Sequence, residues 1–291
     1  MHFLVVESFS FRIMVSLFTR SKDRDYQMGG FPRGVCVIPY LILHCSKVFN
    51  SLYYKFIMHK KEQKKITIAI DGPAASGKST TAKLVAQKLG YLHIDTGAMY
   101  RALTLKVLEK KLDLSDKEKI VSLAQTSTIR LEGGNPTTKV FLDGTDISDK
   151  IRTPQVNRSV SVVSSYQGVR EVMVRGQQRI SKNGGVVLEG RDIGTVVLPS
   201  AELKIFMIAS VQERVKRRKK DLALCGIEAE EEELIKEIET RDRKDSTRDI
   251  SPLRKAADAI ELDTSNLTIE EQVDFIVMRA KKMIREKEVV V

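Results

Sequence analysis

Gly72-Pro73-Ala74-Ala75-Ser76-Gly77-Lys78-Ser79 matches the pattern G-x-x-x-x-G-K-[ST] at every fixed position. An apolar run over residues 66–70 precedes it and predicts a short buried strand. After it, Gly90 can end a helix whose apolar residues recur at helical spacing, namely Ala82, Val85, Ala86 and Leu89. A glycine-rich loop between a strand and a helix is the setting that a phosphate-binding loop requires.

The chemistry of phosphate groups explains this spacing. Glycines let the backbone wrap so that N–H groups point inward, and the helix beginning near Gly77 adds the positive end of its dipole. We expect Lys78 to reach the outer phosphates and the Ser79 hydroxyl to ligate Mg²⁺. The segment therefore predicts a site for ATP and Mg²⁺; the alternative is a glycine-rich surface turn. The predicted contacts are Gly72, Pro73, Ala74, Ala75, Ser76, Gly77, Lys78, Ser79 and Thr80.

The charge of the chain is unevenly distributed. Of its 291 residues 42% are apolar and 30% charged, which is typical of a globular protein with a buried core. The formal net charge is +11, but residues 1–65 alone carry eleven Lys and Arg against four Asp and Glu. The remainder is only mildly basic, which suits phosphorylated small ligands as well as it suits a polyanion. Charge alone therefore does not choose between them.

Composition changes near residue 65. The apolar patch at 35–43 is shorter than the roughly 20 residues that span a bilayer, and the layout of a signal peptide is missing. We expect residues 1–65 to lie outside the folded domain of residues 66–291; a targeting segment and a partner-binding tail are the alternatives. The three cysteines, Cys36, Cys45 and Cys225, have no metal-ligand spacing, which fits a reducing compartment.

Beyond the loop, strands alternate with helices. Further strands are predicted at 91–94, 186–188, 203–208 and 259–262. Capping-box patterns place helix starts at Ser115, with Glu118, and at Thr268, with Glu271. Such alternation predicts an α/β fold with a central parallel sheet flanked by helices on both faces.

Two segments interrupt the alternation. Residues 128–147 predict small antiparallel strands, with turn signals at Asn135-Pro136 and Asp143-Gly144. Residues 212–249 are intensely charged and helical. The second segment is either a solvated helix pair or a mobile lid that carries arginines to a phosphate site.

The phosphate loop does not identify the molecule that accepts a phosphoryl group. The sequence has no Asn-Lys-x-Asp segment of the kind with which GTPases read guanine. A second anionic ligand would need cations beyond Lys78, and arginine suits it because its planar fork pairs with phosphate oxygens. The candidates in the body of the chain, several at predicted strand ends where ligands of such sheets bind, are Arg101, Arg170, Arg191, Arg241, Arg243 and Arg248.

Three further segments carry a resemblance to a known family. Residues 95–101 (DTGAMYR), 189–197 (EGRDIGTVV) and 241–248 (RDRKDSTR) are similar to signature segments of the bacterial-type cytidylate kinases. They occur in the family's order, and the similarity runs from about residue 66 to about 285. The resemblance implies a P-loop kinase with an acceptor-binding insert at about 125–165 and a helical lid at about 212–249.

The resemblance also implies residue roles. Thr96 and Arg101 would contact the monophosphate site, and Arg170 would hold the acceptor phosphate. The remaining predicted contacts are Ser161, Arg191 and Asp192 to the cytosine edge, Asp245 to the sugar hydroxyls and Arg248 to the phosphates. Lys78, Arg191 and Arg248 would be the catalytic residues, and Ser79 and Glu189 would hold Mg²⁺.

The chemistry of the base agrees with the Arg191–Asp192 pair. Cytosine presents an amino donor beside ring acceptors, which complements an adjacent arginine and aspartate. The competing interpretation is that Arg191 and Asp192 pair with each other.

The implied activity is transfer of the γ-phosphoryl group of ATP to CMP or dCMP, giving CDP or dCDP and ADP. The alternatives are a P-loop kinase for UMP, AMP or a small metabolite, and a nucleic-acid-binding ATPase, which would need a basic path studded with aromatic residues. We expect only small-molecule substrates, neither nucleic acid nor a membrane as partner, a monomer, and a cytoplasmic location.

Overall fold

The computed structural model describes residues 65–132, 138–224 and 226–289. The prediction for residues 1–65 falls, apart from Lys65, outside these residues, as do the turn signal at Asn135-Pro136 and Cys225. Within the described ranges, none of the helices is long and apolar enough to cross a membrane.

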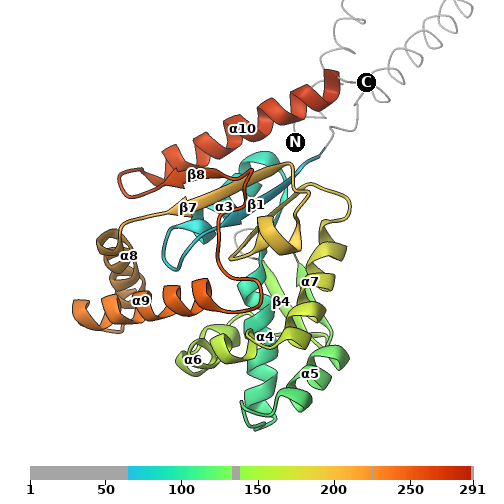
Figure 1. Cartoon of the computed structure of the whole chain (residues 1–291), viewed down its shortest axis with the longest axis vertical. Coiled ribbons are helices and arrows are strands. Elements are labelled where there is room, and N and C mark those ends of the chain that lie inside the picture. The colour runs from blue at the N-terminus through green and yellow to red at the C-terminus, as the bar shows by residue number, and fades with distance from the viewer. Residues whose placement is uncertain (1–64, 133–137, 225, 290–291) are drawn as a thin grey trace, which may run out of the picture. The chain divides into compact units, whose positions relative to one another are not determined.

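A five-stranded parallel sheet is the centre of the fold (Figure 1). Its strands, in the order in which they lie side by side, are β2 (Leu92–Asp95), β6 (Val186–Gly190), β1 (Thr67–Asp71), β7 (Leu203–Ile208) and β8 (Ile260–Asp263). All five strands were predicted, and the α/β class is confirmed. Their bounds differ from the predicted ones by at most two residues, because a buried apolar run does not coincide exactly with the hydrogen-bonded ladder.

The register of the sheet brings three acidic residues to one edge. Asp95 at the end of β2 lies opposite Glu189 in β6, and Asp71 at the end of β1 lies opposite Gly190. Because parallel strands end on the same side, the loops that follow β1, β2 and β6 converge there.

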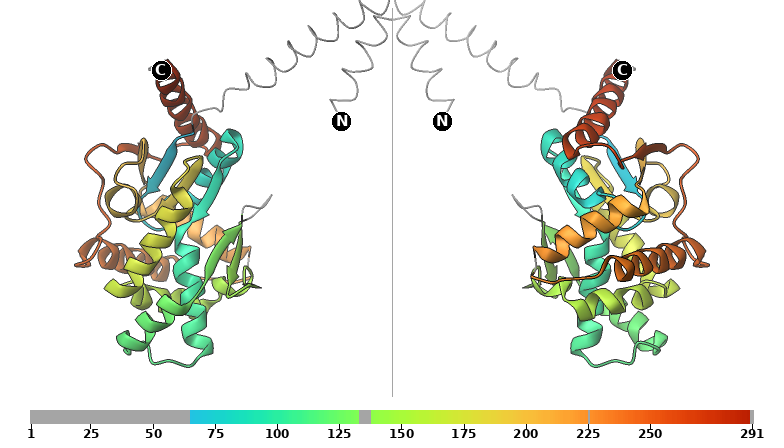
Figure 2. Two further views of the ribbon diagram at one scale, coloured as in Figure 1. Left: turned by 90° about the vertical axis from the view of Figure 1, so that its right-hand side faces the viewer. Right: turned by 90° about the vertical axis from the view of Figure 1, so that its left-hand side faces the viewer.

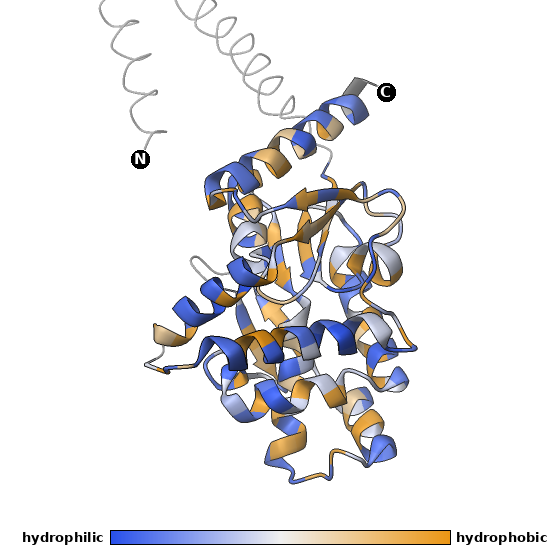
Figure 3. Ribbon diagram, turned by 60° about the vertical axis from the view of Figure 1, so that its left-hand side comes forward, coloured by the Kyte–Doolittle hydropathy of each residue, from blue (hydrophilic) through white to orange (hydrophobic). Residues whose placement is uncertain are grey.

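The two faces of the sheet are covered by different helices. Along β1, Ile68 and Ile70 pack on one side with α3 (Lys78–Leu89) and α10 (Ile269–Val289), whereas Ala69 packs on the other. The helices on that second side are α4 (Thr96–Glu109), α5 (Lys117–Thr126), α6 (Pro154–Val163) and α7 (Gln167–Ser181). Figure 3 shows that polar and apolar residues alternate along α10, the helix that ends near the label C, as expected for a helix with one buried face.

The predicted antiparallel insert is present beside α4 (Figure 2). It consists of β3 (Ile129–Glu132), β4 (Lys139–Leu142) and β5 (Thr145–Asp146), followed by the 3₁₀ turn η2 (Lys150–Arg152). Between β4 and β5, Asp143 (φ 50°) and Gly144 (φ 85°) form the two-residue turn that the sequence signalled. The side chains of Leu131, Val140 and Leu142 are buried and pack in the same hydrophobic cluster as α4.

The charged segment forms a helix pair, α8 (Val211–Ala223) and α9 (Glu231–Thr247). The two helices share a small core of their own, made of Val215, Leu234 and Ile238. This core is separate from the two clusters that cover the sheet. The helical prediction for 212–249 is therefore confirmed.

Helix caps show one prediction confirmed and one wrong. Thr268 and Glu271 form the expected reciprocal box, with the Thr268 N–H donating to Glu271 at 2.8 Å and the Glu271 N–H donating to Thr268 at 3.2 Å. Ser115 does not cap α5, because its N–H and hydroxyl both donate to Asp113 at 2.8 Å. Asp116 caps this helix instead and accepts from the Lys119 N–H at 3.1 Å.

Candidate functional site

The phosphate loop, residues 72–79, joins the end of β1 to the start of α3. Gly72 has φ 148°, and a Cβ atom there would lie 2.0 Å from the carbonyl oxygen of Met207, so only glycine fits. Gly77 has φ 91° and is the N-cap of α3. The loop therefore closes tightly, and the first free N–H groups of α3 are available to an anion.

Lys78 is buried at the first position of α3. Its ammonium group donates to the carbonyl oxygen of Pro73 at 2.6 Å and to the Ser76 hydroxyl at 3.3 Å. Burial, and next the positive charge of Arg191, hold the pKa of Lys78 well below its usual value. A negative ligand would oppose both effects, so the surroundings of Lys78 favour binding of an anion.

Ser79 and Glu189, the two predicted metal ligands, are in direct contact. The Ser79 hydroxyl donates to one carboxylate oxygen of Glu189 at 2.6 Å, and the Nε2 atom of His93 lies 3.0 Å from the other. Within the described residues, no group of three or more His, Cys, Asp and Glu side chains is arranged to hold a metal ion. A hydroxyl and one carboxylate nevertheless fit Mg²⁺, which keeps several waters and binds through few protein oxygens together with phosphates.

Asp71 and His93 belong to this site and were not predicted. Both oxygens of buried Asp71 accept backbone N–H groups, from Ile193 at 2.8 Å and from Gly194 at 2.7 Å. Burial raises the pKa of Asp71 to about 6, against the lowering effect of these two hydrogen bonds. Asp71 thus ties the strand before the phosphate loop to η3, a π-helical turn over Ile193–Val197.

A sequence signal existed for Asp71. Like Glu189, it is an acidic residue at the end of an apolar strand, and it directly precedes the glycine-rich loop. His93 had a weaker signal: it lies two positions before Asp95 in β2 and therefore points to the same side of the strand.

The segment after β2 starts with another polar cluster. Asp95 caps α4 by accepting from the Ala98 N–H at 3.1 Å, and it pairs with Arg101 at 2.5 Å and Arg152 at 3.3 Å. Burial opposes ionisation of Asp95, but the two arginines outweigh it and lower its pKa. Thr96 is buried and donates its hydroxyl to the carbonyl oxygen of Glu189 at 2.7 Å, so it joins α4 to β6. Ligand contacts of Thr96 and Arg101 stay predictions.

A second polar cluster lies where β6 ends. Asp192 is buried and pairs with Arg170 of α7, and its other oxygen lies 3.7 Å from Arg248. The Arg170 guanidinium lies over the ring of Tyr100, 5.6 Å from its centroid. Two arginines from distant segments thus meet one carboxylate. Asp71, at the end of the strand before the phosphate loop, is bonded to η3, the turn that directly follows this carboxylate.

Arg191 connects the sheet to the helix pair α8 and α9. Its Nε atom donates to Asp245 of α9 at 2.8 Å. Arg191 and Asp192 therefore each bind another partner, and the interpretation that they pair with each other is wrong. Both residues lie in the bend between β6 and η3, where the backbone directs them to different neighbours.

Three predicted residues make fewer contacts with these polar clusters. Ser161 lies half-buried in α6, and in the described part of the chain its hydroxyl makes no hydrogen bond to these clusters. Arg241 and Arg243 are exposed on α9, although Arg241 is close enough to Lys78 to lower its pKa. The role of Ser161 at the cytosine edge stays a prediction.

The phosphate loop with Lys78, here called the lysine loop, thus lies at one edge of the sheet. Beside it lies a group of paired side chains, here called the arginine–aspartate layer, to which α9 contributes Asp245. Its members are Arg170, Arg191, Asp192, Asp245 and Arg248. The sequence model of one family, described as cytidylate kinase, matches residues 68–282. The cytidylate kinase of Pediococcus pentosaceus is 51% identical over 223 residues, which cover 77% of this chain and 99% of the relative. That of Bacillus subtilis strain 168 is 50% identical over 223 residues, covering 77% of this chain and 100% of the relative. Because the matched region contains both the lysine loop and the arginine–aspartate layer, the protein belongs to the cytidylate kinase family.

Proposed function

We propose that this protein transfers the γ-phosphoryl group of ATP to CMP or dCMP, giving CDP or dCDP and ADP. The observation that carries the proposal is the meeting of two sets of cations at one sheet edge, Lys78 in the phosphate loop and the arginines around Asp192. Membership in the cytidylate kinase family supports the choice of a cytidine nucleotide as acceptor.

The phosphate loop is the donor half of the site. Backbone N–H groups at the start of α3 and the ammonium group of Lys78 would hold the β- and γ-phosphates of ATP. Ser79 and Glu189 would hold Mg²⁺, directly or through water. The metal ion, when bound, neutralises charge on the phosphates. His93 contacts Glu189 and would keep its carboxylate directed toward Ser79.

The arginine–aspartate layer is the acceptor half. Arg170, Arg191 and Arg248 supply planar donors that match a monophosphate, and Asp192 supplies an acceptor for the amino group of cytosine. Asp245 would accept from the sugar hydroxyls and is held by Arg191 from the sheet side. Each of these side chains already touches another member of the layer, so little ordering remains when a nucleotide binds.

Transfer needs no general base. The acceptor oxygen belongs to a phosphate whose second pKa is about 6, so it is largely ionised at neutral pH. What the residues contribute is alignment of the two nucleotides and stabilisation of charge on the transferred group by Lys78, Arg191 and Arg248. The lid helices α8 and α9 would exclude water, which would otherwise take the phosphoryl group.

A coupled assay that measures ADP with each acceptor separately tests this function. With ATP and Mg²⁺ in excess, CMP and dCMP should support turnover with kcat/KM at least about ten times that of UMP or AMP, and single-stranded nucleic acid should not stimulate ATP turnover. A preference for UMP, AMP or a small metabolite would replace the proposed acceptor. Strong stimulation by nucleic acid would favour the ATPase alternative. The expectations of a monomer and of a cytoplasmic location stay predictions.

A further inference from the structure

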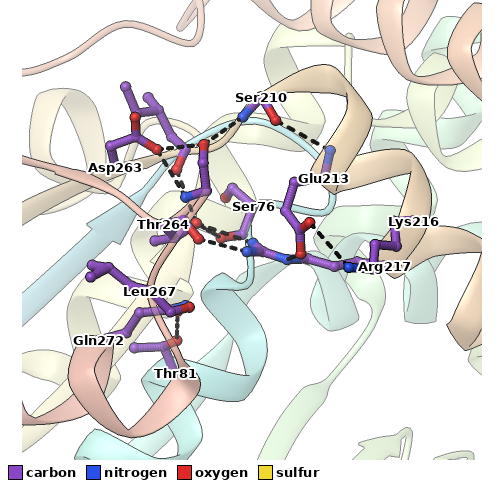
Figure 4. Close-up of polar contacts among 12 residues, drawn as sticks. Ser76, Thr81, Ser210, Glu213, Lys216, Arg217, Asp263, Thr264, Leu267 and Gln272 are labelled. Atoms are coloured by element: carbon purple, nitrogen blue, oxygen red, sulfur yellow. Dashed lines mark hydrogen bonds and ion pairs between the residues drawn. The ribbon is translucent and has the colours of Figure 1, made fainter.

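The lid helix α8 is bonded to the phosphate loop through one buried threonine (Figure 4). Arg217 of α8 donates to the carbonyl oxygen of Thr264 at 2.7 Å and to its hydroxyl at 3.1 Å. The Thr264 hydroxyl lies 3.0 Å from the carbonyl oxygen of Ser76 in the phosphate loop. Three residues from three separate segments thus form one continuous chain of hydrogen bonds.

The surroundings hold this chain in place. Thr264 and Ser76 are both 0% exposed. Thr264 follows β8 directly, and its N–H donates to the carbonyl oxygen of Ile208 at the end of β7 at 2.8 Å. The Nε atom of Arg217 donates to Glu213 one turn earlier at 3.1 Å, which leaves the other guanidinium nitrogens directed at Thr264. None of these contacts depends on an exposed, freely rotating group.

Donors and acceptors fix the direction of the chain. Arginine has only donors, so the Thr264 hydroxyl must accept from Arg217, and its single proton is left for a carbonyl oxygen. Two carbonyl oxygens lie at 3.0 Å from this hydroxyl, those of Ser76 and Ile208. The Ile208 carbonyl oxygen already accepts from the Thr264 N–H, which favours donation of this proton to Ser76 and so joins the turn after β8 to the phosphate loop.

The Ser76–Gly77 peptide is a sensitive point of the loop. The Ser76 hydroxyl accepts from Lys78, and Gly77, in its left-handed conformation, begins α3. A Cβ atom on Gly77 would lie 3.4 Å from a guanidinium nitrogen of Arg217, so the Arg217 side chain lies near this peptide as well. A rotation of the peptide would redirect the N–H groups that face the donor phosphates.

We propose that Thr264 and Arg217 are positioning residues for the donor nucleotide. They hold the Ser76–Gly77 peptide in the orientation that binds phosphate, and they make this orientation depend on where the lid helix α8 lies. The inference rests on the proposed function for the identity of the donor, ATP, but not for the acceptor. Its consequence is selective: loss of this chain of hydrogen bonds weakens the binding of ATP and leaves the binding of CMP nearly unaffected.

Thr264→Val tests this directly because it keeps the shape of the side chain and removes its hydroxyl. We expect the KM for ATP to rise roughly five- to twenty-fold, as for loss of one hydrogen bond, and the KM for CMP to change less than about two-fold. Thr264→Ser, which restores the hydroxyl, should return the KM for ATP to within about three-fold of the starting protein. Thr104→Val is a matched control, since Thr104 is also 0% exposed and donates to a backbone carbonyl, that of Tyr100 in α4.

Arg217→Met extends the test to the lid side. Its effect on ATP binding and that of Thr264→Val should not add in the double variant, because both break the same chain. Arg217 is partly exposed, 23% by side chain, so this variant serves if Thr264→Val does not fold. Melting temperatures of all variants separate a loss of stability from a loss of ATP affinity.

Calorimetric titration with ATP and Mg²⁺ in the absence of any acceptor distinguishes this inference from the proposed function. Weakened ATP binding in Thr264→Val, without CMP turnover by the unaltered protein, would support the positioning role and reject the acceptor. Unchanged ATP binding, equal rises in both KM values, or additive effects in the double variant would overturn the positioning role.

Discussion

Lys78 is a buried ammonium group placed beside other cations. Since burial and Arg191 both disfavour its charge, the fold keeps this lysine at a cost that a phosphate ligand offsets. Lys78→Ala should therefore lower kcat by roughly 10²- to 10³-fold, the size seen when one donor to transition-state charge is removed. The melting temperature should not fall. Steady-state kinetics and thermal unfolding of the same sample measure both quantities.

The control for this variant is Lys83→Ala, five residues further along α3. It removes the same charge from the same helix outside the phosphate loop, and we expect kcat to stay within about two-fold of its starting value. Near-normal turnover in Lys78→Ala would remove this residue from the mechanism.

We propose that Asp192 discriminates between the two nucleotides. It lies between Arg170 and Arg248 and is the proposed acceptor for the amino group of cytosine. Asp192→Asn should raise the KM for CMP roughly 10- to 100-fold, in the range of a lost charged hydrogen bond, and the KM for ATP less than about three-fold. Because Arg170 would lose its partner, unfolding must be monitored as well. Equal losses for CMP and ATP would contradict base recognition by this carboxylate.

Asp71 predicts a specific dependence of stability on pH. Its pKa is raised from the ordinary value of 3.8 to about 6, so the native state binds this proton more tightly than the unfolded state does. The stabilising contribution is complete below pH 3.8 and is lost as the pH rises through about 6, a change on the order of 3 kcal/mol. The difference in unfolding free energy between the unaltered protein and Asp71→Ala should shrink over this interval. Urea unfolding at several pH values measures it, and a constant difference would contradict the raised pKa.

Local sequence patterns predicted some residues of the site and not others. Lys78, Ser79 and Glu189 were predictable because a short motif or a strand end fixes their place, and Ser79 and Glu189 meet as expected. Asp71 carried the same strand-end signal. His93, by contrast, depends on the register of two strands, and no local pattern states which residue of β6 it will face.

Among the elements, helices α8 and α9 are held together by a core of their own. Ile238 is 3% exposed and packs in that core with Val215 and Leu234. Ile238→Ala should weaken the contact between α8 and α9 by about 2–5 kcal/mol. We expect a looser lid to admit water, so the ratio of free phosphate to CDP formed from ATP should rise. Quantifying both products in one reaction checks this prediction.

Ile276→Ala in α10 is the matched control, because Ile276 is 0% exposed but belongs to the core under the sheet. This variant should lower the melting temperature without raising the phosphate-to-CDP ratio. An unchanged ratio in Ile238→Ala would argue against water exclusion by the helix pair.

Elements were predicted to the extent that local chemistry determines them. The strands and the Asp143–Gly144 turn follow from apolar runs and from residues that tolerate positive φ. The start of α5 was misplaced because Ser115 and Asp116 are both good caps, and the choice between them depends on Asp113, which engages Ser115. Such competition between neighbouring polar residues is decided by small energies that a pattern does not contain.

At the scale of the whole molecule, the site is assembled by the parallel sheet. Residues from β1, β2 and β6 meet because these strands end at one edge, which the alternation of strands and helices predicted. Which arginine meets which aspartate was not predictable. Arg191 and Asp245 are 54 positions apart, and their contact depends on the path that the chain takes through α8 and α9.

The proposed function requires that the phosphoryl group pass directly from ATP to CMP within this site. It is tested by mixing the protein with ATP labelled at the γ-phosphate, Mg²⁺ and CMP, and by following the label through the first turnovers. We predict that the label appears in CDP in the same amount as ADP is formed. Label released as free phosphate while CDP stays unlabelled would rule out direct transfer.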